Sequence, residues 1–266
     1  MNTVAITDPD DPRIAAYRDI RERDLASRDG LFIAEGKVVL DVLFSAGRFA
    51  PRSAFVLESR LQGMLPVLAK APADMPVYVA APQVMDRVAG FHLHRGVLAA
   101  VERRPAEGAD DVLASLPGSA LVVVLAGIAN HDNVGAIFRN AAAFGVDAVL
   151  LDSTCCDPLY RKAIRVSVGA ALKVPFAIGG DELALLELVS AAGFEQYALS
   201  PSGGIDIAAL RRANRTALWL GTEGEGLPET VMSRMRTVRI PIAAGFDSLN
   251  VAAASAIALH RLFRQD

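Results

Sequence analysis

Six short apolar runs alternate with helix-like segments through the second half of the chain. The runs lie at Leu121–Ala126, Ala148–Leu151, Val174–Ala177, Gln196–Leu199, Ala217–Leu220 and Val238–Pro241. Helices are expected at Val134–Phe144, Leu159–Ser167, Glu182–Ala192, Ile207–Arg212, Glu229–Arg234 and Leu249–Phe263. Near-continuous apolar strands that alternate with helices are typical of a parallel sheet covered on both faces. We therefore expect an α/β domain over residues 119–266, with ligands bound outside the carboxyl ends of its strands.

A smaller α/β domain is expected before this one. Its pattern predicts helices at Gly36–Ala46 and Pro82–Ala89, and strands at Ala54–Leu57, Val77–Ala80 and Gly96–Val101. The composition then shifts at residues 102–111, which are charged, contain Pro and Gly, and lack apolar periodicity, as linkers do. We expect residues 1–108 to form the first domain and residues 109–118 to form the linker.

Composition narrows the class of protein. The chain has 266 residues, of which 52% are hydrophobic, so a folded globular protein is expected. No apolar stretch is long enough to span a bilayer, and no basic segment followed by an apolar one opens the chain. The only cysteines, Cys155 and Cys156, are adjacent and rarely bridge in such positions, so a reducing cytoplasm is the expected location.

The charged residues do not decide whether the protein binds nucleic acid. The formal net charge of −3 argues against general binding of polyanions. Arg strongly outnumbers Lys, and Arg binds phosphate with two parallel hydrogen bonds, but a bias of the whole genome towards Arg explains most of these residues equally well. The Arg cluster between Arg13 and Arg28 is either a solvated helix face or a docking surface for RNA.

The most informative segment follows the first apolar run of the second domain. A strand, a short polar turn and a helix that we expect to begin at Val134 form an arrangement that holds anions, because free helix N–H groups point towards the turn. Arg139 would then lie in the first turns of this helix, where the helix dipole disfavours a cation. We infer that something other than helix stability accounts for an Arg at position 139.

Two later segments also place a turn after a strand. In residues 220–228, Gly221, Gly224 and Gly226 suit a close approach of backbone to a ligand, although a glycine-rich turn without function remains an alternative. In residues 240–254, Ser248 or Asn250 can cap the last helix, which is itself a purely structural role. Neither phosphate-binding fingerprint of nucleotide enzymes is present, which counts against a nucleotide-dependent enzyme on an ordinary doubly wound sheet.

Together the three segments resemble motifs one, two and three of the SpoU (TrmH) family of RNA ribose 2′-O-methyltransferases, in the SPOUT class. Motif one, Asn-x-Gly-x-x-x-Arg, is met by Asn133, Gly135 and Arg139, and motif two, Gly-x-Glu-x-x-Gly, by Gly221, Glu223 and Gly226. Motif three is met by Ile240, Pro241, Ile242, Ser248, Leu249 and Asn250. The likeness covers residues 121–263. Residues 32–37 and 94–99 are similar to the family's small substrate-binding domain, with Arg95 where the family often has Gln.

The resemblance implies a fold, a cofactor and partners. The C-terminal domain would thread into a trefoil knot whose loops hold S-adenosylmethionine, the protein would be a homodimer, and the substrate would be RNA, ribosomal rather than transfer RNA. Cofactor contacts would come from Leu199, Ser200, Gly221, Glu223, Gly226, Ile240, Ile242, Leu249 and Asn250. Transfer RNA as substrate, a non-catalytic RNA-binding protein that keeps the fold, and self-resistance to a ribosome-directed antibiotic stay open as alternatives.

The resemblance also implies a set of catalytic residues, namely Arg139, Asn133, Glu223, Ser248 and Asn250. Arg is a poor base because it stays protonated above pH 12. We therefore expect Arg139 to hold an RNA phosphate and to stabilise charge on the ribose oxygen. No metal is expected, since His92 and His94 lack a third ligand close in sequence, and Cys155 and Cys156 are expected in a core or loop role.

Overall fold

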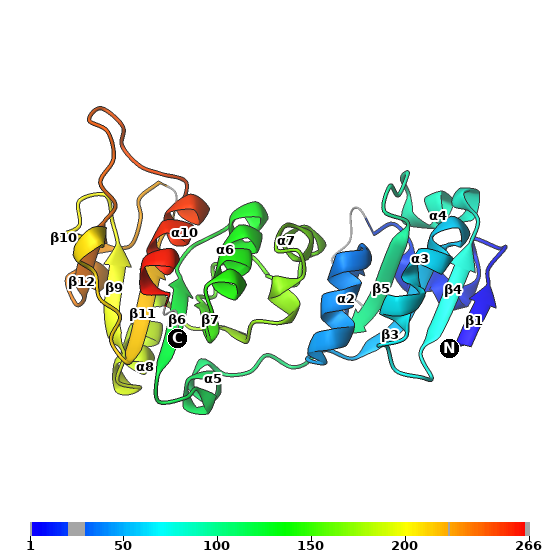
Figure 1. Ribbon diagram of the computed structural model, residues 1–266, viewed down its shortest axis with the longest axis horizontal. Coiled ribbons are helices and arrows are strands. Elements are labelled where there is room, and N and C mark those ends of the chain that lie inside the picture. Colours follow the sequence, from blue (N-terminus) through cyan, green and yellow to red (C-terminus); the bar gives the residue numbers. More distant parts are fainter. Residues whose placement is uncertain (1, 21–29, 223, 264–266) are drawn as a thin grey trace. The chain divides into compact units, whose positions relative to one another are not determined.

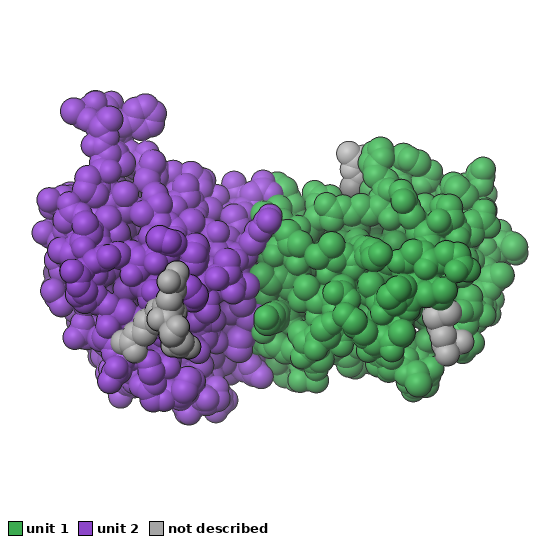
Figure 2. Space-filling view, viewed as in Figure 1, with its two compact units in different colours: residues 1–105, 159–173 green, residues 106–158, 174–266 purple. Residues whose placement is uncertain are grey.

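The computed structural model describes residues 2–20, 30–222 and 224–263. It divides into two compact units (Figure 2). The first contains residues up to 105 together with residues 159–173, and the second contains residues 106–158 and those from 174 onward.

The first unit is built on a five-stranded sheet of order β1-β4-β3-β5-β2 (Figure 1). The strands are β1 (Asn2–Ala5), β2 (Leu31–Glu35), β3 (Pro51–Leu57), β4 (Pro76–Ala80) and β5 (Val97–Glu102). β5 runs antiparallel to its neighbours β2 and β3, whereas the β1–β4 and β4–β3 pairs are parallel. A mixed α/β architecture for this part of the chain is confirmed.

Helices of the first unit are α2 (Lys37–Ala46), α3 (Glu58–Leu68), α4 (Pro82–Ala89) and the 3-10 helix η1 (Pro12–Tyr17). The expected helix over Arg13–Arg28 is replaced in its first part by η1, and Arg21, Arg23 and Arg28 lie outside the described residues. The strands β1 and β2 and the helix α3 had not been expected. Buried Tyr17 anchors η1, since its hydroxyl accepts the backbone N–H of Ala100 and bonds the hydroxyl of Ser53.

The segment 159–173 packs on the first unit, although it lies between two strands of the second in sequence. It contains α7 (Arg161–Val166) and the 3-10 helix η2 (Ala170–Leu172). Arg161 donates from Nη1 to Oε2 of the buried Glu35 at 2.8 Å, and its guanidinium lies over the ring of Phe91. A buried carboxylate needs such a partner.

The second unit contains the expected parallel sheet. Seven strands run in the order β10-β12-β9-β11-β6-β7-β8, and every paired neighbour is parallel (Figure 1). They are β6 (Ala120–Leu125), β7 (Ala148–Leu151), β8 (Phe176–Ile178), β9 (Glu195–Leu199), β10 (Ile205–Asp206), β11 (Arg215–Leu220) and β12 (Arg236–Arg239). All residues of β6 and β7 are buried, which is why these runs are continuously apolar.

Helices cover both faces of this sheet. The helices α5 (Ala109–Ser115), α8 (Glu182–Ala191) and α9 (Glu229–Met232) join Val122, Val124 and Trp219 in one hydrophobic cluster. The helices α6 (His131–Ala143) and α10 (Val251–Leu262) lie side by side, tied by Asn140 Nδ2, which donates to the carbonyl of Ala252 and to Ser255 Oγ at 2.9 Å each. The 3-10 helix η3 (Ile207–Ala209) stands where a longer helix had been expected.

The boundary between the domains differs from the expected one. Residues 109–118 were expected as a linker, but they begin with α5, whose Val112 and Leu113 are buried in the core of the second unit. The two acidic residues at its start favour a helix N-terminus, and they also masked its apolar face. Within the described ranges, no helix is long and apolar enough to cross a membrane.

Candidate functional site

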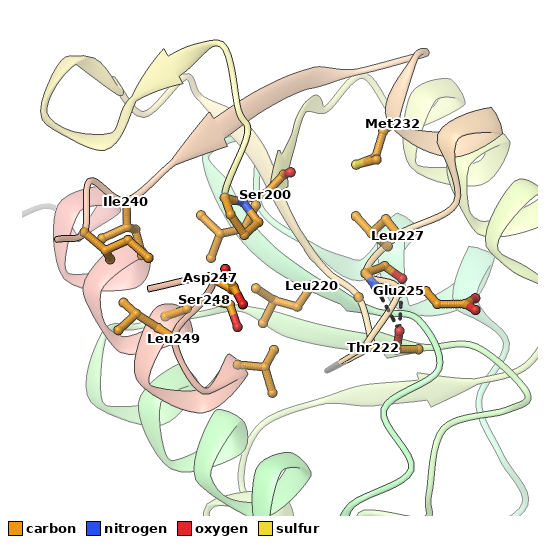
Figure 3. Close-up of a pocket in the computed structure, with 18 residues that line it drawn as sticks. Ser200, Leu220, Thr222, Glu225, Leu227, Met232, Ile240, Asp247, Ser248 and Leu249 are labelled. Carbon is orange, nitrogen blue, oxygen red and sulfur yellow. Dashed lines mark hydrogen bonds between the residues drawn. The ribbon is translucent and has the colours of Figure 1, made fainter. Parts of the chain in front are cut away.

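A cavity of about 280 Å³ lies in the second unit at the carboxyl ends of β9, β11 and β12 (Figure 3). This is the edge where parallel sheets hold their ligands. Three loops and two helices line it, with Leu199, Ser200, Pro201, Leu220, Gly221, Thr222, Gly224, Glu225, Gly226, Leu227, Met232, Ile240, Ile242, Asp247, Ser248, Leu249, Val251 and Ala254. The second and third motif segments thus supply different sides of the site, whereas none of the described lining residues comes from the first.

Gly221 shows why the loop after β11 needs glycine. A side-chain carbon at this position would lie 2.4 Å from the backbone of Gly226 and Leu227, too close for any real contact. The loop also closes on itself, because the hydroxyl of Thr222 accepts the N–H of Gly226 at 3.1 Å and donates to its carbonyl at 3.2 Å. This part of the cavity wall is therefore bare, ordered backbone. Glu223, expected at the site, lies outside the described residues.

Asn250 joins the loop after β12 to the start of α6. Its Oδ1 caps α10 by accepting the N–H groups of Ala252 and Ala253, at 2.9 and 3.2 Å. Its Nδ2 donates to Oδ1 of Asn133 on α6 at 3.0 Å. Asn133 is buried, so this bond fixes the start of α6 against the start of α10. The side chain of Asn250 therefore both caps α10 and holds the start of α6 in place.

Arg139 lies elsewhere than expected. Asn130 caps α6 by accepting the N–H of Asp132, so the helix begins at His131 and Arg139 falls in its C-terminal half. The expectation of a cation in the first turns was wrong, since the polar turn supplied the cap earlier. Arg139 is exposed, does not line the cavity, and makes no hydrogen bond or ion pair with another described residue.

Of the residues expected to contact the cofactor, seven line the cavity, namely Leu199, Ser200, Gly221, Gly226, Ile240, Ile242 and Leu249. Ser248, expected as catalytic, lines it too, whereas Asn133 and Asn250 are not among the lining residues. Sequence reasoning missed Thr222, Glu225 and Asp247, although each is adjacent to a motif residue. It also missed Met232 on α9, for which no motif gave a signal.

The charge of the cavity is negative. Among the lining residues, the charged side chains are the carboxylates Glu225 and Asp247, and the remaining side chains are apolar or hydroxyl-bearing. A ligand that carries a positive charge and an apolar ring system is complementary to such a surface.

The cysteine pair and the histidine pair noted in the sequence are not arranged for catalysis. Burial raises the pKa of Cys156 to about 11, and it raises the pKa of Cys155 further, so little thiolate exists near neutral pH. His92 bonds the carboxylate of Asp86 at 2.7 Å, which lowers the pKa of Asp86. Within the described part of the chain, no three His, Cys, Asp or Glu residues are placed to hold a metal ion.

Residues 120–260 match the model of the SpoU rRNA Methylase family. A Mycobacterium tuberculosis protein, named as an uncharacterized tRNA/rRNA methyltransferase, is 43% identical over 97% of this chain and 91% of its own. The 23S rRNA (guanosine-2′-O-)-methyltransferase RlmB of Bordetella pertussis is 34% identical over 73% of this chain and 80% of its own.

Solved structures share the fold over nearly the whole chain. The S-adenosylmethionine-bound rRNA methyltransferase of Sinorhizobium meliloti superposes with a TM-score of 0.80 at 22% identity, covering 97% of each chain. The SpoU methyltransferase AviRb of Streptomyces viridochromogenes, in complex with the same cofactor, gives 0.81 at 22% identity over 94% of this chain and 97% of that one.

Proposed function

The chain belongs to the SpoU rRNA methylase family, and we propose that it transfers a methyl group from S-adenosylmethionine to the 2′-hydroxyl of a ribose in ribosomal RNA. One observation carries the proposal. The loops after β9, β11 and β12, which include the second and third motif-bearing segments, build one cavity with bare backbone at Gly221 and negative charge at the carboxyl end of a parallel sheet.

The residues of the cavity fit S-adenosylmethionine. Leu199, Leu220, Ile240 and Leu249 offer apolar surface for an adenine ring, and Gly221, which also lines the cavity, presents only backbone to a ligand. The carboxylates of Glu225 and Asp247 suit a cation. When bound, this cofactor supplies a methyl group on a positively charged sulfur.

The protein's own groups would position the ribose and stabilise charge on its oxygen. Arg139 is an exposed cation, so its role is to hold an RNA phosphate and to offset negative charge on the 2′-oxygen. The Asn133–Asn250 bond orients the helix that carries Arg139 relative to the loop that carries Ser248. Positioning of this kind supplies much of the rate in group transfer.

The choice of substrate rests on relatives and on chemistry. Only RNA offers a 2′-hydroxyl. RlmB of Bordetella pertussis, by its name, acts on 23S rRNA, while the mycobacterial relative is named for tRNA and rRNA alike. We place ribosomal RNA first and transfer RNA second, and we assign RNA docking to the first unit, where Lys37 and Arg95 are exposed. A cytoplasmic location follows from this substrate.

A homodimer and a trefoil knot belong to the same proposal. The C-terminal segment exposes large apolar side chains that water disfavours, with exposed fractions of 75% for Phe246, 42% for Ile257 and 41% for Phe263. A second copy that packs on α10 would cover Ile257 and Phe263. The knot is proposed from membership of the family alone.

The proposal is tested by comparing RNA from a strain with the gene and a strain without it. We expect mass spectrometry to find one 2′-O-methylated nucleotide of ribosomal RNA missing in the deletion strain and restored by the wild-type gene. A methyl group missing from transfer RNA would move the substrate to the second candidate. Unchanged RNA, together with a purified protein that does not bind S-adenosylmethionine, would favour a non-catalytic RNA-binding protein.

A further inference from the structure

Asp152 stands directly after β7 and is fully buried. Its carboxylate accepts four hydrogen bonds. Oδ1 accepts the N–H of Thr154 at 3.0 Å, the hydroxyl of Thr154 at 2.9 Å and the N–H of Cys155 at 2.9 Å, while Oδ2 accepts the N–H of Gly127 at 2.9 Å. One oxygen therefore shapes the loop after β7, and the other holds the loop after β6.

The residue held by Oδ2 touches the cavity loop. Gly127 has φ +69°, and a side-chain carbon there would lie 2.6 Å from Cγ2 of Thr222. Thr222 lines the cavity and closes its loop through the two bonds to Gly226. Gly127 also precedes the start of α6 by only a few residues. The position of Gly127 thus bears on both the cavity wall and the helix of Asn133 and Arg139.

We propose that Asp152 is a positioning residue for the methyl-transfer site, which it sets by holding Gly127 against Thr222; the proposal rests on the proposed function. Asp152 belongs to none of the three motifs. Its burial and its complete set of donors distinguish it from a surface carboxylate that merely caps a turn. Buried carboxylates are kept where their hydrogen bonds are needed.

The chemistry of the carboxylate supplies a selective test. Asp152→Asn keeps the size of the side chain but turns one acceptor oxygen into an NH2 group. If the amide oxygen keeps the turn at Thr154 and Cys155, its NH2 faces the N–H of Gly127, and two donors then oppose each other. The substitution therefore releases Gly127 while the local turn stays in place.

Asp147 provides a matched control at the other end of the same strand. Its Oδ2 accepts the N–H of Leu121 at 2.7 Å, so it also ties β7 to β6, but at the amino end of these parallel strands. We expect Asp152→Asn to weaken S-adenosylmethionine binding at least tenfold in calorimetry, and Asp147→Asn to change it less than twofold. Equal effects of the two substitutions would overturn the proposal.

A second pair of variants tests the contact itself and does not depend on how Asp152→Asn folds. Gly127→Ala pushes a methyl group into Cγ2 of Thr222, and Thr222→Ser removes that carbon but keeps the hydroxyl that closes the loop. We expect Gly127→Ala to weaken cofactor binding strongly in the wild-type background and less strongly when Thr222→Ser is present, the remaining loss coming from alanine held at the left-handed φ of +69°. Additive effects would contradict coupling through this contact.

The failure of this inference differs from failure of the proposed function. If the wild-type protein does not bind S-adenosylmethionine, the proposed function is wrong. If the wild-type protein binds it and Asp152→Asn binds it equally well, the function stands and the role of Asp152 is wrong.

Discussion

At the scale of single residues, the side-chain amide of Asn250 has two structural roles. Its oxygen caps α10, and its nitrogen holds Asn133 on α6. The capping role was foreseen from sequence because Asn before a helix is a common pattern, whereas the bond to Asn133 spans 117 positions and no local pattern reveals it. The motif residues are thus partly structural, and their effects on stability and on activity are separable.

Two substitutions separate these roles. Asn250→Ala removes the cap and the bond to Asn133, and we expect it to lower the free energy of unfolding by about 2–3 kcal/mol. Asn250→Asp keeps the capping oxygen and removes the donor, so we expect a smaller loss, about 1 kcal/mol. Urea denaturation measures both. If Asn250→Asp is as harmful as Asn250→Ala, the cap contributes nothing of its own.

Arg139 is the residue for which we propose a catalytic role and no structural one. Its side chain is exposed and pairs with no other described residue, so Arg139→Ala leaves the fold and the cavity intact. We expect this variant to bind S-adenosylmethionine within about threefold of wild type and to lose methyl transfer by at least about 100-fold. Arg139→Lys serves as a control that keeps the charge. A parallel loss of cofactor affinity in calorimetry would make Arg139 part of the binding site instead.

At the scale of elements, the loop after β11 shows what the backbone contributes. Gly221 lies against Gly226 and Leu227 so closely that no side chain fits, whereas Gly224 in the same loop has open space around it. Sequence alone presents these glycines as equivalent, because the crossing of backbone segments is a tertiary feature. Their surroundings in the fold are nevertheless different.

This difference predicts unequal effects of one added methyl group. We expect Gly221→Ala to force the loop apart and to lower the melting temperature by several degrees, since the clash is with backbone rather than with a flexible side chain. Gly224→Ala should leave the melting temperature within about one degree. Calorimetric melting of the two variants checks this, and equal temperatures would show that the loop has room at Gly221.

Helix starts and short strands were the elements hardest to foresee. α6 begins at His131 because the side chain of Asn130 caps it, and the apolar pattern alone suggested Val134. β2 was missed because its apolar run is short and ends at Glu35, whose burial is permitted by an ion pair with Arg161, far along the chain. Asp152 was missed for the same reason, since its four donors come together only in the fold.

At the scale of the whole molecule, the parallel sheet was predictable and the division into units was not. Fully buried strands such as β6 are recognisable from composition alone. By contrast, residues 159–173 pack on the first unit although their sequence neighbours belong to the second. Residues 159–173 are held on the first unit by tertiary contacts, among them the bond between Arg161 and Glu35. Hydrophobic periodicity carries no information about such contacts.

The Glu35–Arg161 pair should therefore stabilise the first unit. Arg161→Ala leaves a buried carboxylate without this partner, and we expect the free energy of unfolding to fall by about 3 kcal/mol. The double variant with Glu35→Gln should recover part of the loss, because the uncompensated charge is removed. Lys162→Ala, one position along and exposed, is the control. Urea denaturation of the four proteins checks the prediction, and no recovery in the double variant would contradict it.

We propose above all that the protein methylates a ribose, with the methyl donor held in the cavity and the RNA held by Arg139. The most direct test incubates the purified protein with ribosomal RNA and S-adenosylmethionine bearing a deuterated methyl group, followed by mass spectrometry of the digested RNA. We expect the label on the 2′-oxygen of one nucleotide, present with wild type and absent with Arg139→Ala. Label on a base, or no label although the cofactor binds, would contradict the claim.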